Sequence, residues 1–189
     1  PISGAETSVL IVDGIDSNIV KKVSSEKILT SFLKSFVKVN LQSTSDLDIV
    51  LLDNSSTKID FDDEEFDLND EYDVTTNVFT PKQDGYYEIL STINIKPDGA
   101  LGITASTNVS LQVHKSSTVI AESSGPLVGA TVGLVNVYLL PIRTVSTLVY
   151  LTTTDTVSFH IQNATGPLGG IDIDLQSTEN GFFYIKQLR

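Results

Sequence analysis

Residues 76–87 read TNVFTPKQDGYY and place Phe79, Pro81, Gly85, Tyr86 and Tyr87 within nine positions, in a 189-residue chain that has only eight Phe and six Tyr. Proline has no amide hydrogen for a sheet ladder, so Pro81 is expected at a strand end. Gly85 allows a tight reversal before the apolar run YYEILSTINI (86–95). The stretch therefore predicts two strands joined by a short link, with Phe79 and Tyr86 holding the crossover from the core side.

Short apolar or alternating segments continue on both sides of this stretch, separated by turns rich in Gly, Pro, Ser and Asn. Helical periodicity is absent after residue 37. This pattern predicts an all-β fold, an antiparallel jelly-roll sandwich over residues 37–189. The further strand-like segments are VKVNLQ (37–42), IVLLD (49–53), SLQVHK (110–115), STVIAES (117–123), VNVYLLPI (135–142), TLVYLTTTDTVSFHIQ (147–162) and GFFYIKQL (181–188).

Residues 1–36 have a different pattern. SVLIVD (8–13) and IVKKVS (19–24) flank the turn-forming GIDSN (14–18), which predicts a hairpin. SEKILTSFLKSF (25–36) follows, and its apolar side chains have helical spacing. A hairpin plus one helix is too small to hold a core alone, so residues 1–36 are expected to be a docking or attachment segment. The helical stripe consists of Ile28, Leu29, Phe32, Leu33 and Phe36.

The formal net charge is −12, and residues 46–73 hold 12 acidic residues against Lys58 alone. The chain has no basic stripe, which argues against nucleic acid as a partner, and an anionic membrane surface is an equally poor one. No apolar run approaches 18 residues and no secretory signal is visible, so membrane insertion is not expected. With no Cys, the chain has no disulfide and no thiolate site.

The segment IDFDDEEFDLNDEYDVTTNVFTPKQDGYYEILSTINI (59–95) resembles the globular heads of the complement C-one-q and tumour necrosis factor (TNF) superfamily. The resemblance extends over residues 58–189, with Thr154 where those heads have Gly before Asp and Ser116-Ser117 in place of their Asn-Gly turn. It implies a homotrimer around a threefold axis, in which exposed aromatics such as Tyr87, Phe183 and Tyr184 would be buried. The residues that carry the motif are Phe61, Tyr72, Asp73, Asn77, Phe79, Thr80, Pro81, Gly85 and Tyr86.

The N-terminal stretch SGAETSVLIVDGIDSNIVKKVSSEKILTSF (3–32) resembles a module of phage tail-fibre and other virion appendage proteins. Together the two resemblances imply a structural protein of the virion surface: a homotrimeric head-fibre, tail-fibre or capsid decoration component that contacts other virion proteins through its N-terminal segment. The alternative is an extracellular complement-type binding module that recognises protein or glycan. In either case the loop tips KPDGALGITAST (96–107), SSGPLVGATVG (123–133) and NATGPLGG (163–170) would contact a host receptor or other ligand.

The acidic run is the main chemical feature, and it has two interpretations. Asp62, Asp67, Asp70 and Asp73 are calcium candidates, because hard cations prefer several carboxylates. The EF-hand spacing fails, since Glu65 stands at the sixth position from Asp60, and the alternative is a solvated acidic loop that keeps trimers soluble. Apart from calcium, no cofactor is expected.

The sequence gives little indication of catalysis. The two histidines, His114 and His160, lie in alternating segments without a second ligand nearby in sequence. Motifs of serine hydrolases, zinc proteases and phosphate loops are absent. We therefore expect a protein that is not an enzyme.

Overall fold

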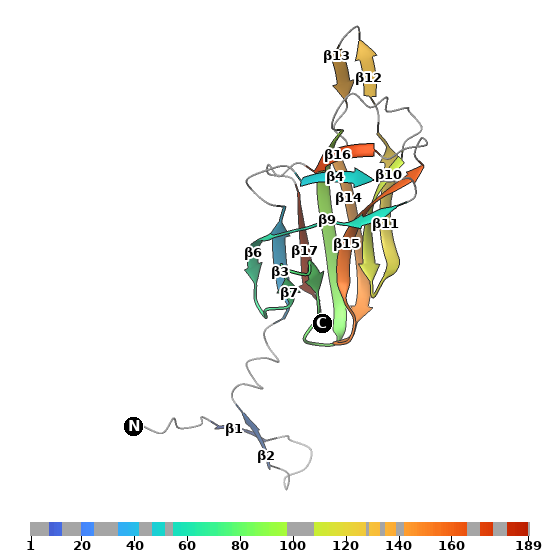
Figure 1. Ribbon diagram of the computed structural model, residues 1–189. Coiled ribbons are helices and arrows are strands. Elements are labelled where there is room, and N and C mark those ends of the chain that lie inside the picture. The colour runs from blue at the N-terminus through green and yellow to red at the C-terminus, as the bar shows by residue number, and fades with distance from the viewer. Residues whose placement is uncertain are drawn as a thin grey trace. The chain divides into compact units, whose positions relative to one another are not determined.

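The computed structural model describes residues 8–12, 20–24, 34–41, 47–51, 55–97, 108–127, 129–132, 135–138, 142–165, 171–175 and 181–188 (Figure 1). The chain divides into two units, Pro1–Lys34 and Ser35–Arg189, which are considered separately. No helix within the described residues is long and apolar enough to cross a membrane. The loop tips 98–107 and 166–170, proposed above for recognition, lie outside the described residues.

The N-terminal unit contains one hairpin. Strands β1 (Ser8–Val12) and β2 (Val20–Ser24) pair antiparallel from Ser8 opposite Ser24 to Val12 opposite Val20, as the sequence predicts. Most of the expected helix, residues 25–33, lies outside the described residues. Its last three residues were assigned wrongly, because Lys34 and Ser35 lie in neither a helix nor a strand and Phe36 begins strand β3 (Phe36–Asn40), which pairs with β17 (Phe182–Gln187). The attachment role of this segment stays a prediction.

The second unit is an all-β sandwich of antiparallel strands, which confirms the predicted fold class. One sheet has the order β4-β16-β9-β17-β3-β6, with β14 also paired to β9, so the long strand β9 runs between β14 and β17 (Figure 1). Its strands are β3 (Phe36–Asn40), β4 (Leu47–Leu51), β6 (Asp63–Asp67), β9 (Gly85–Pro97), β14 (Ile142–Leu151), β16 (Ile171–Leu175) and β17 (Phe182–Gln187).

The other sheet has the order β11-β10-β15-β8-β7, with β5 also paired to β15. A separate pair, β12 (Gly129–Val132) and β13 (Val135–Tyr138), forms an antiparallel hairpin. The strands of this second sheet are β5 (Ser56–Lys58), β7 (Tyr72–Asp73), β8 (Val78–Phe79), β10 (Asn108–Lys115), β11 (Thr118–Pro126) and β15 (Val157–Thr165).

Several elements differ from the sequence prediction. The run 147–162 is not one strand: a turn closed by the Asp155 carboxylate, which accepts the Thr152 amide at 2.7 Å, separates β14 from β15. Residues 129–132, expected in a loop tip, form β12. Strand β16 (IDIDL) was not predicted, although its alternation is clear once Ile173 and Leu175 are seen buried against the core.

The core lies between the sheets and follows the strand alternation. On β9, Tyr87, Ile89, Ile93 and Ile95 are all fully buried, since residues two apart share a face. The β10–β11 turn shows why a Ser-Ser pair works there: Ser116 and Ser117 both adopt positive φ (46° and 73°), the conformation that Asn-Gly usually supplies. The fold therefore keeps the turn geometry although the residues differ.

Candidate functional site

The residues singled out from the sequence separate into a buried and an exposed group. Tyr86 is 54% exposed and Tyr184 is half-buried, with its hydroxyl donating to Glu88 Oε1 at 3.1 Å. The others are buried inside one chain: Phe61, Tyr72, Phe79, Pro81, Gly85, Tyr87 and Phe183.

Two predictions about this group were therefore wrong. Tyr87 and Phe183 have no exposed surface, so they cannot be interface aromatics that a trimer would cover. It is Tyr87, not Tyr86, that packs on Phe79 from the core side, with ring centroids 5.8 Å apart. The physical reason is strand parity: Tyr87 shares the inward face of β9 with Ile89, and its neighbour must point outward.

The motif residues hold the two sheets together. The Phe183 ring packs against Phe159, Phe61 and Tyr72 at centroid distances of 4.5, 5.1 and 5.0 Å. The Tyr72 hydroxyl donates to the Phe61 carbonyl at 2.8 Å and lies 3.2 Å from Asn77 Oδ1. Burial, reinforced by nearby acidic side chains, raises the pKa of Tyr72 well above its usual range, so the phenol remains a donor. These residues therefore have a structural role in the core.

An exposed apolar surface lies on the outward side of β9 and β14. We call it the β9–β14 face; it consists of Tyr86 (54% exposed), Ile142 (60%), Leu148 (61%) and Tyr150 (47%). Tyr86 and Tyr150 are direct cross-strand partners, and their rings meet edge to face at 5.2 Å. Exposed Thr144 and Ser146 separate Ile142 from the other three on this face. Large apolar side chains exposed on one sheet face are typical of protein contact surfaces.

The acidic run is folded rather than a loose loop, since it contains β6 and β7. The Asp67 carboxylate accepts the amides of Asn69, Glu71 and Tyr72 at 3.1, 2.5 and 2.7 Å. The Asp73 carboxylate accepts the Thr75 amide at 2.8 Å, and this bond above all lowers the pKa of Asp73. Two of the four calcium candidates, Asp67 and Asp73, therefore already accept hydrogen bonds from backbone amides.

The other two calcium candidates are exposed. Asp70, at φ 56°, forms a 3.7 Å ion pair with Lys82. Partial burial raises the pKa of Asp62. Within the described ranges, no group of three or more His, Asp or Glu is placed to hold a metal ion. Calcium binding stays a prediction for the chain.

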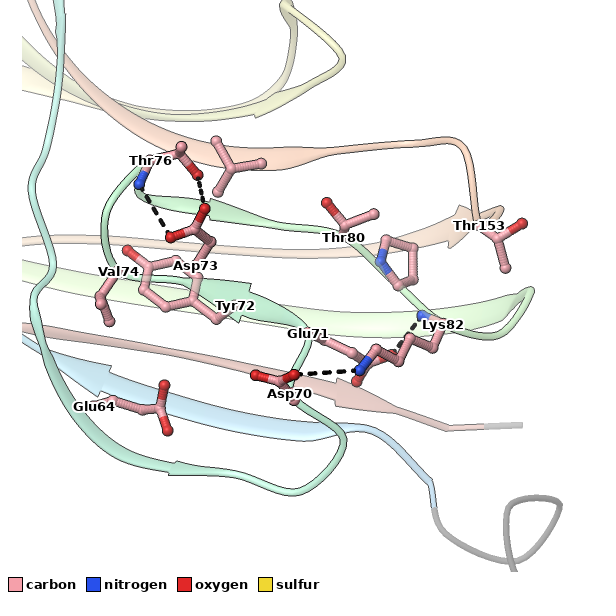
Figure 2. A pocket seen from close by; sticks show the side chains of 12 residues that line it. Glu64, Asp70, Glu71, Tyr72, Asp73, Val74, Thr76, Thr80, Lys82 and Thr153 are labelled. Atoms are coloured by element: carbon pink, nitrogen blue, oxygen red, sulfur yellow. Dashed lines mark hydrogen bonds and ion pairs between the residues drawn. The ribbon is translucent and has the colours of Figure 1, made fainter. Parts of the chain in front are cut away.

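A pocket of about 730 Å³ lies beside β7 and β8, and we call it the acidic pocket (Figure 2). Four carboxylic residues and one lysine contribute to its wall: Glu64, Asp70, Glu71, Asp73 and Lys82. Its less polar wall is formed by Tyr72, Val74, Val78 and Pro81. The sequence indicated the concentration of acids but not the pocket, which depends on how β6, β7 and the 80–82 segment meet.

Glu71 differs from the other acids of the pocket because only 4% of it is exposed. Its Oε1 accepts hydrogen bonds from Ser35 Oγ at 2.9 Å and from the Lys82 amide at 2.6 Å. Its Oε2 is buried and has no hydrogen-bond partner in the described part of the chain. Glu71 was not singled out from the sequence, because one acid among twelve gives no sign of which is buried.

The two histidines form a second arrangement that the sequence did not reveal. His160 lies on β15, and its Nε2 is 3.1 Å from Ser158 Oγ, while the His114 Nε2 on β10 donates to Gln112 Oε1 at 3.0 Å. Burial lowers the pKa of both rings, and that of His160 falls to about 4. Only the β10–β15 register, which places Gln112 opposite His160, brings the rings together.

No family model matches the sequence, and no curated protein matches it significantly. Solved structures do match the fold. A TNF, Eiger, from S. frugiperda is 9% identical with a TM-score of 0.53, covering 82% of this chain and 93% of its own. The globular domain of zebrafish complement 1qA protein is 16% identical with a TM-score of 0.50, covering 83% and 98%. Murine APRIL at pH 8.5 is 9% identical with a TM-score of 0.51, covering 82% and 100%.

These likenesses establish the class of fold. The second unit is a C-one-q/TNF-like jelly roll, as the 59–95 motif predicts. The solved structures give no corresponding support to the likeness between residues 3–32 and virion appendage proteins.

Proposed function

We propose that the chain is a non-enzymatic binding head that assembles as a homotrimer and recognises a protein or glycan ligand outside the cell. The observation that carries this proposal is the β9–β14 face, where four large apolar side chains remain about half exposed in the single chain. The structures of like fold are a TNF, an APRIL and a complement domain, which supports a binding head.

A second copy of the same chain is the simplest partner that would bury this face. Most soluble oligomers are closed, symmetric assemblies of one chain. Full burial of a Leu, Ile or aromatic side chain contributes about 1.5–3 kcal/mol, so repeating the face three times offsets a substantial part of the cost of association. The acidic run lies on β6 and β7 rather than on β9 and β14. Its cluster of carboxylates is therefore not part of this face.

Analytical ultracentrifugation of the full chain at micromolar concentration tests the assembly. The expected species has three times the chain mass of 20.4 kDa. Leu148→Lys should dissociate it, because each copy would bring a cation into the apolar contact. Val119→Lys is the matched control, since Val119 is 44% exposed but lies on β11 of the other sheet. A wild-type chain that sediments as a monomer would contradict the proposal.

A virion-surface role is the second candidate. The observation in its favour is the β1–β2 hairpin in a unit separate from the head, as an attachment segment would require. The structures of like fold support the extracellular binding role more directly than this one. If the virion role holds, deleting residues 1–34 should leave the head folded but remove it from purified virus particles. Retention of the truncated head on the particles would exclude attachment through this segment.

A further inference from the structure

Glu71, which lines the acidic pocket, has a buried acceptor atom that no donor within the described residues satisfies. Glu71 Oε2 is enclosed and unpartnered within the described residues, while Oε1 of the same carboxyl group accepts two hydrogen bonds. Leaving a buried carboxylate oxygen without a donor costs about 1–3 kcal/mol or more, so native structures rarely keep one without a reason. A donor supplied from outside the chain would remove this cost.

The surroundings of Glu71 favour a positively charged donor. Glu64, Asp70 and Asp73 share the pocket with it, against the single ammonium group of Lys82. Burial raises the pKa of Glu64, and the charges of Asp67 and Asp70 add to that effect, as expected where carboxylates crowd together. An entering cation would relieve this repulsion.

A metal ion is a poor fit to this pocket. Its carboxylates do not converge into a group of three in the described part of the chain. A volume of about 730 Å³ also suits an organic group better than a bare ion, which needs ligands at 2.3–2.6 Å if it is calcium. The walls from Val74, Val78 and Pro81 offer apolar surface for a hydrocarbon stem.

The side chain of Lys82 already occupies part of this space. In Figure 2 the Glu71 side chain extends towards Lys82, whose own side chain crosses in front of it. The Lys82 ammonium donates to the Asn69 carbonyl and lies 3.7 Å from Asp70 Oδ2, yet the side chain is 54% exposed. Such an exposed ion pair contributes little stability, so breaking it costs little free energy.

We propose that the acidic pocket binds the guanidinium group of an arginine on a partner protein, which displaces the Lys82 ammonium and donates to Glu71 Oε2. Arginine suits the site better than lysine because its planar group carries five donors and is more weakly hydrated. Its stem packs along the apolar wall while its donors face the carboxylates. This inference deepens the proposed binding role and rests on that role for the presence of a protein partner.

The direct test measures binding of a fluorescein-labelled Gly-Arg-Gly peptide to the full chain by fluorescence anisotropy at low salt. A matched peptide carries citrulline, which has the shape of arginine without its charge. The arginine peptide should bind at least about tenfold more tightly than the citrulline peptide, as charge-assisted hydrogen bonds differ from neutral ones. Equal binding of the two peptides would overturn the inference.

Substitutions then locate the site. Glu71→Gln keeps the shape of the side chain and should lower the affinity for the arginine peptide about tenfold. Glu122→Gln on β11 should leave that affinity unchanged. If Glu71→Gln lowers the melting temperature too far for the assay, Glu64→Gln on the same pocket wall should weaken binding about threefold. An affinity unaffected by either pocket substitution would overturn the proposal.

Lys82 provides a test in the opposite direction. Lys82→Ala removes the competing ammonium group and should raise the affinity for the arginine peptide about threefold. Lys186→Ala on β17 should leave that affinity unchanged. Weaker binding in Lys82→Ala would show that Lys82 does not compete for the site. Calcium chloride that stabilises the chain through Glu71, without any arginine binding, would assign the pocket to a metal instead.

The outcomes for this pocket and for the trimer are distinguishable. A stable trimer that fails to bind the arginine peptide overturns the pocket assignment alone. A monomer that binds the peptide overturns the trimer and leaves the pocket assignment in place.

Discussion

The imidazole rings of His114 and His160 stack on neighbouring strands, with centroids 3.9 Å apart and planes 13° from parallel. The pKa of His160 is lowered to about 4, first by burial and then by the charges of His114 and Lys58. Because an ordinary histidine titrates near 6.5, the unfolded chain binds more protons than the folded chain between about pH 6.5 and 4. The contribution of His160 to the free energy of unfolding is therefore fully present above that window and is lost as the pH falls through it.

We expect acid to destabilise the wild-type head through this pair by about 1 kcal/mol, after allowing for solvent screening of a half-buried ring. The measurement is thermal unfolding at pH 7 and pH 4.5 for wild type and His160→Gln. The wild-type melting temperature should fall by about 2–4 °C more than that of the variant. Parallel acid losses in the two proteins would contradict the prediction, because carboxylates elsewhere titrate in both.

Removal of the Tyr72 hydroxyl tests the hydrogen bonds of the core motif. Tyr72→Phe retains the ring contact with Phe183 at 5.0 Å but leaves the Phe61 carbonyl without its donor. The expected loss is about 1–3 kcal/mol in the free energy of unfolding, measured by urea titration. Thr118→Val, which removes an exposed hydroxyl on β11, should stay within about 0.5 kcal/mol of wild type. Similar losses in the two variants would argue against a special role for Tyr72.

The neighbouring tyrosines of β9 should have opposite effects. Tyr87→Ala empties a fully buried site and should cost about 3–5 kcal/mol of stability. Tyr86→Ala removes half-exposed surface, so it should leave each chain folded while weakening self-association. Urea unfolding and ultracentrifugation of both variants separate the two effects. A strongly destabilised Tyr86→Ala chain would contradict the inward and outward assignment of these residues.

The turn carboxylate of Asp67 should matter more than its exposed neighbours. Asp67→Ala removes the acceptor for three backbone amides and should cost about 2 kcal/mol, measured by thermal or urea unfolding. Asp62→Ala, at an exposed position, should change stability by less than about 0.5 kcal/mol. Equal effects would show that the Asp67 bonds do not hold the β6–β7 connection.

Local signals in the sequence were sufficient for the fold class and for several of the strands. Pro81 and Gly85 mark where the chain leaves β8 and enters β9, since one residue cannot donate and the other permits a tight reversal. The strands β10, β11 and β17 were equally visible from alternation and turn residues. These features depend on a few adjacent residues, which is why they could be read without the structure.

Features that depend on long-range register were not predicted. Two adjacent aromatics leave the inward face of β9 ambiguous, although Ile89 and Ile93 further along the strand could have decided it. The acidic segment DEEFD has low β propensity and becomes β6 through its pairing with β3 and the Lys38–Glu65 ion pair. The unpartnered Glu71 oxygen likewise depends on contacts between segments that are distant in sequence.

Among the described residues, strand β6 is the last strand of its sheet, and its Asp63, Glu64 and Glu65 are exposed. A terminal strand carries unpaired backbone groups that invite another chain to add on and start a fibril. Like charges on that strand repel an identical copy, so sheet growth stops at this edge. We therefore expect the acidity of the segment to protect a protein rich in β-structure against aggregation.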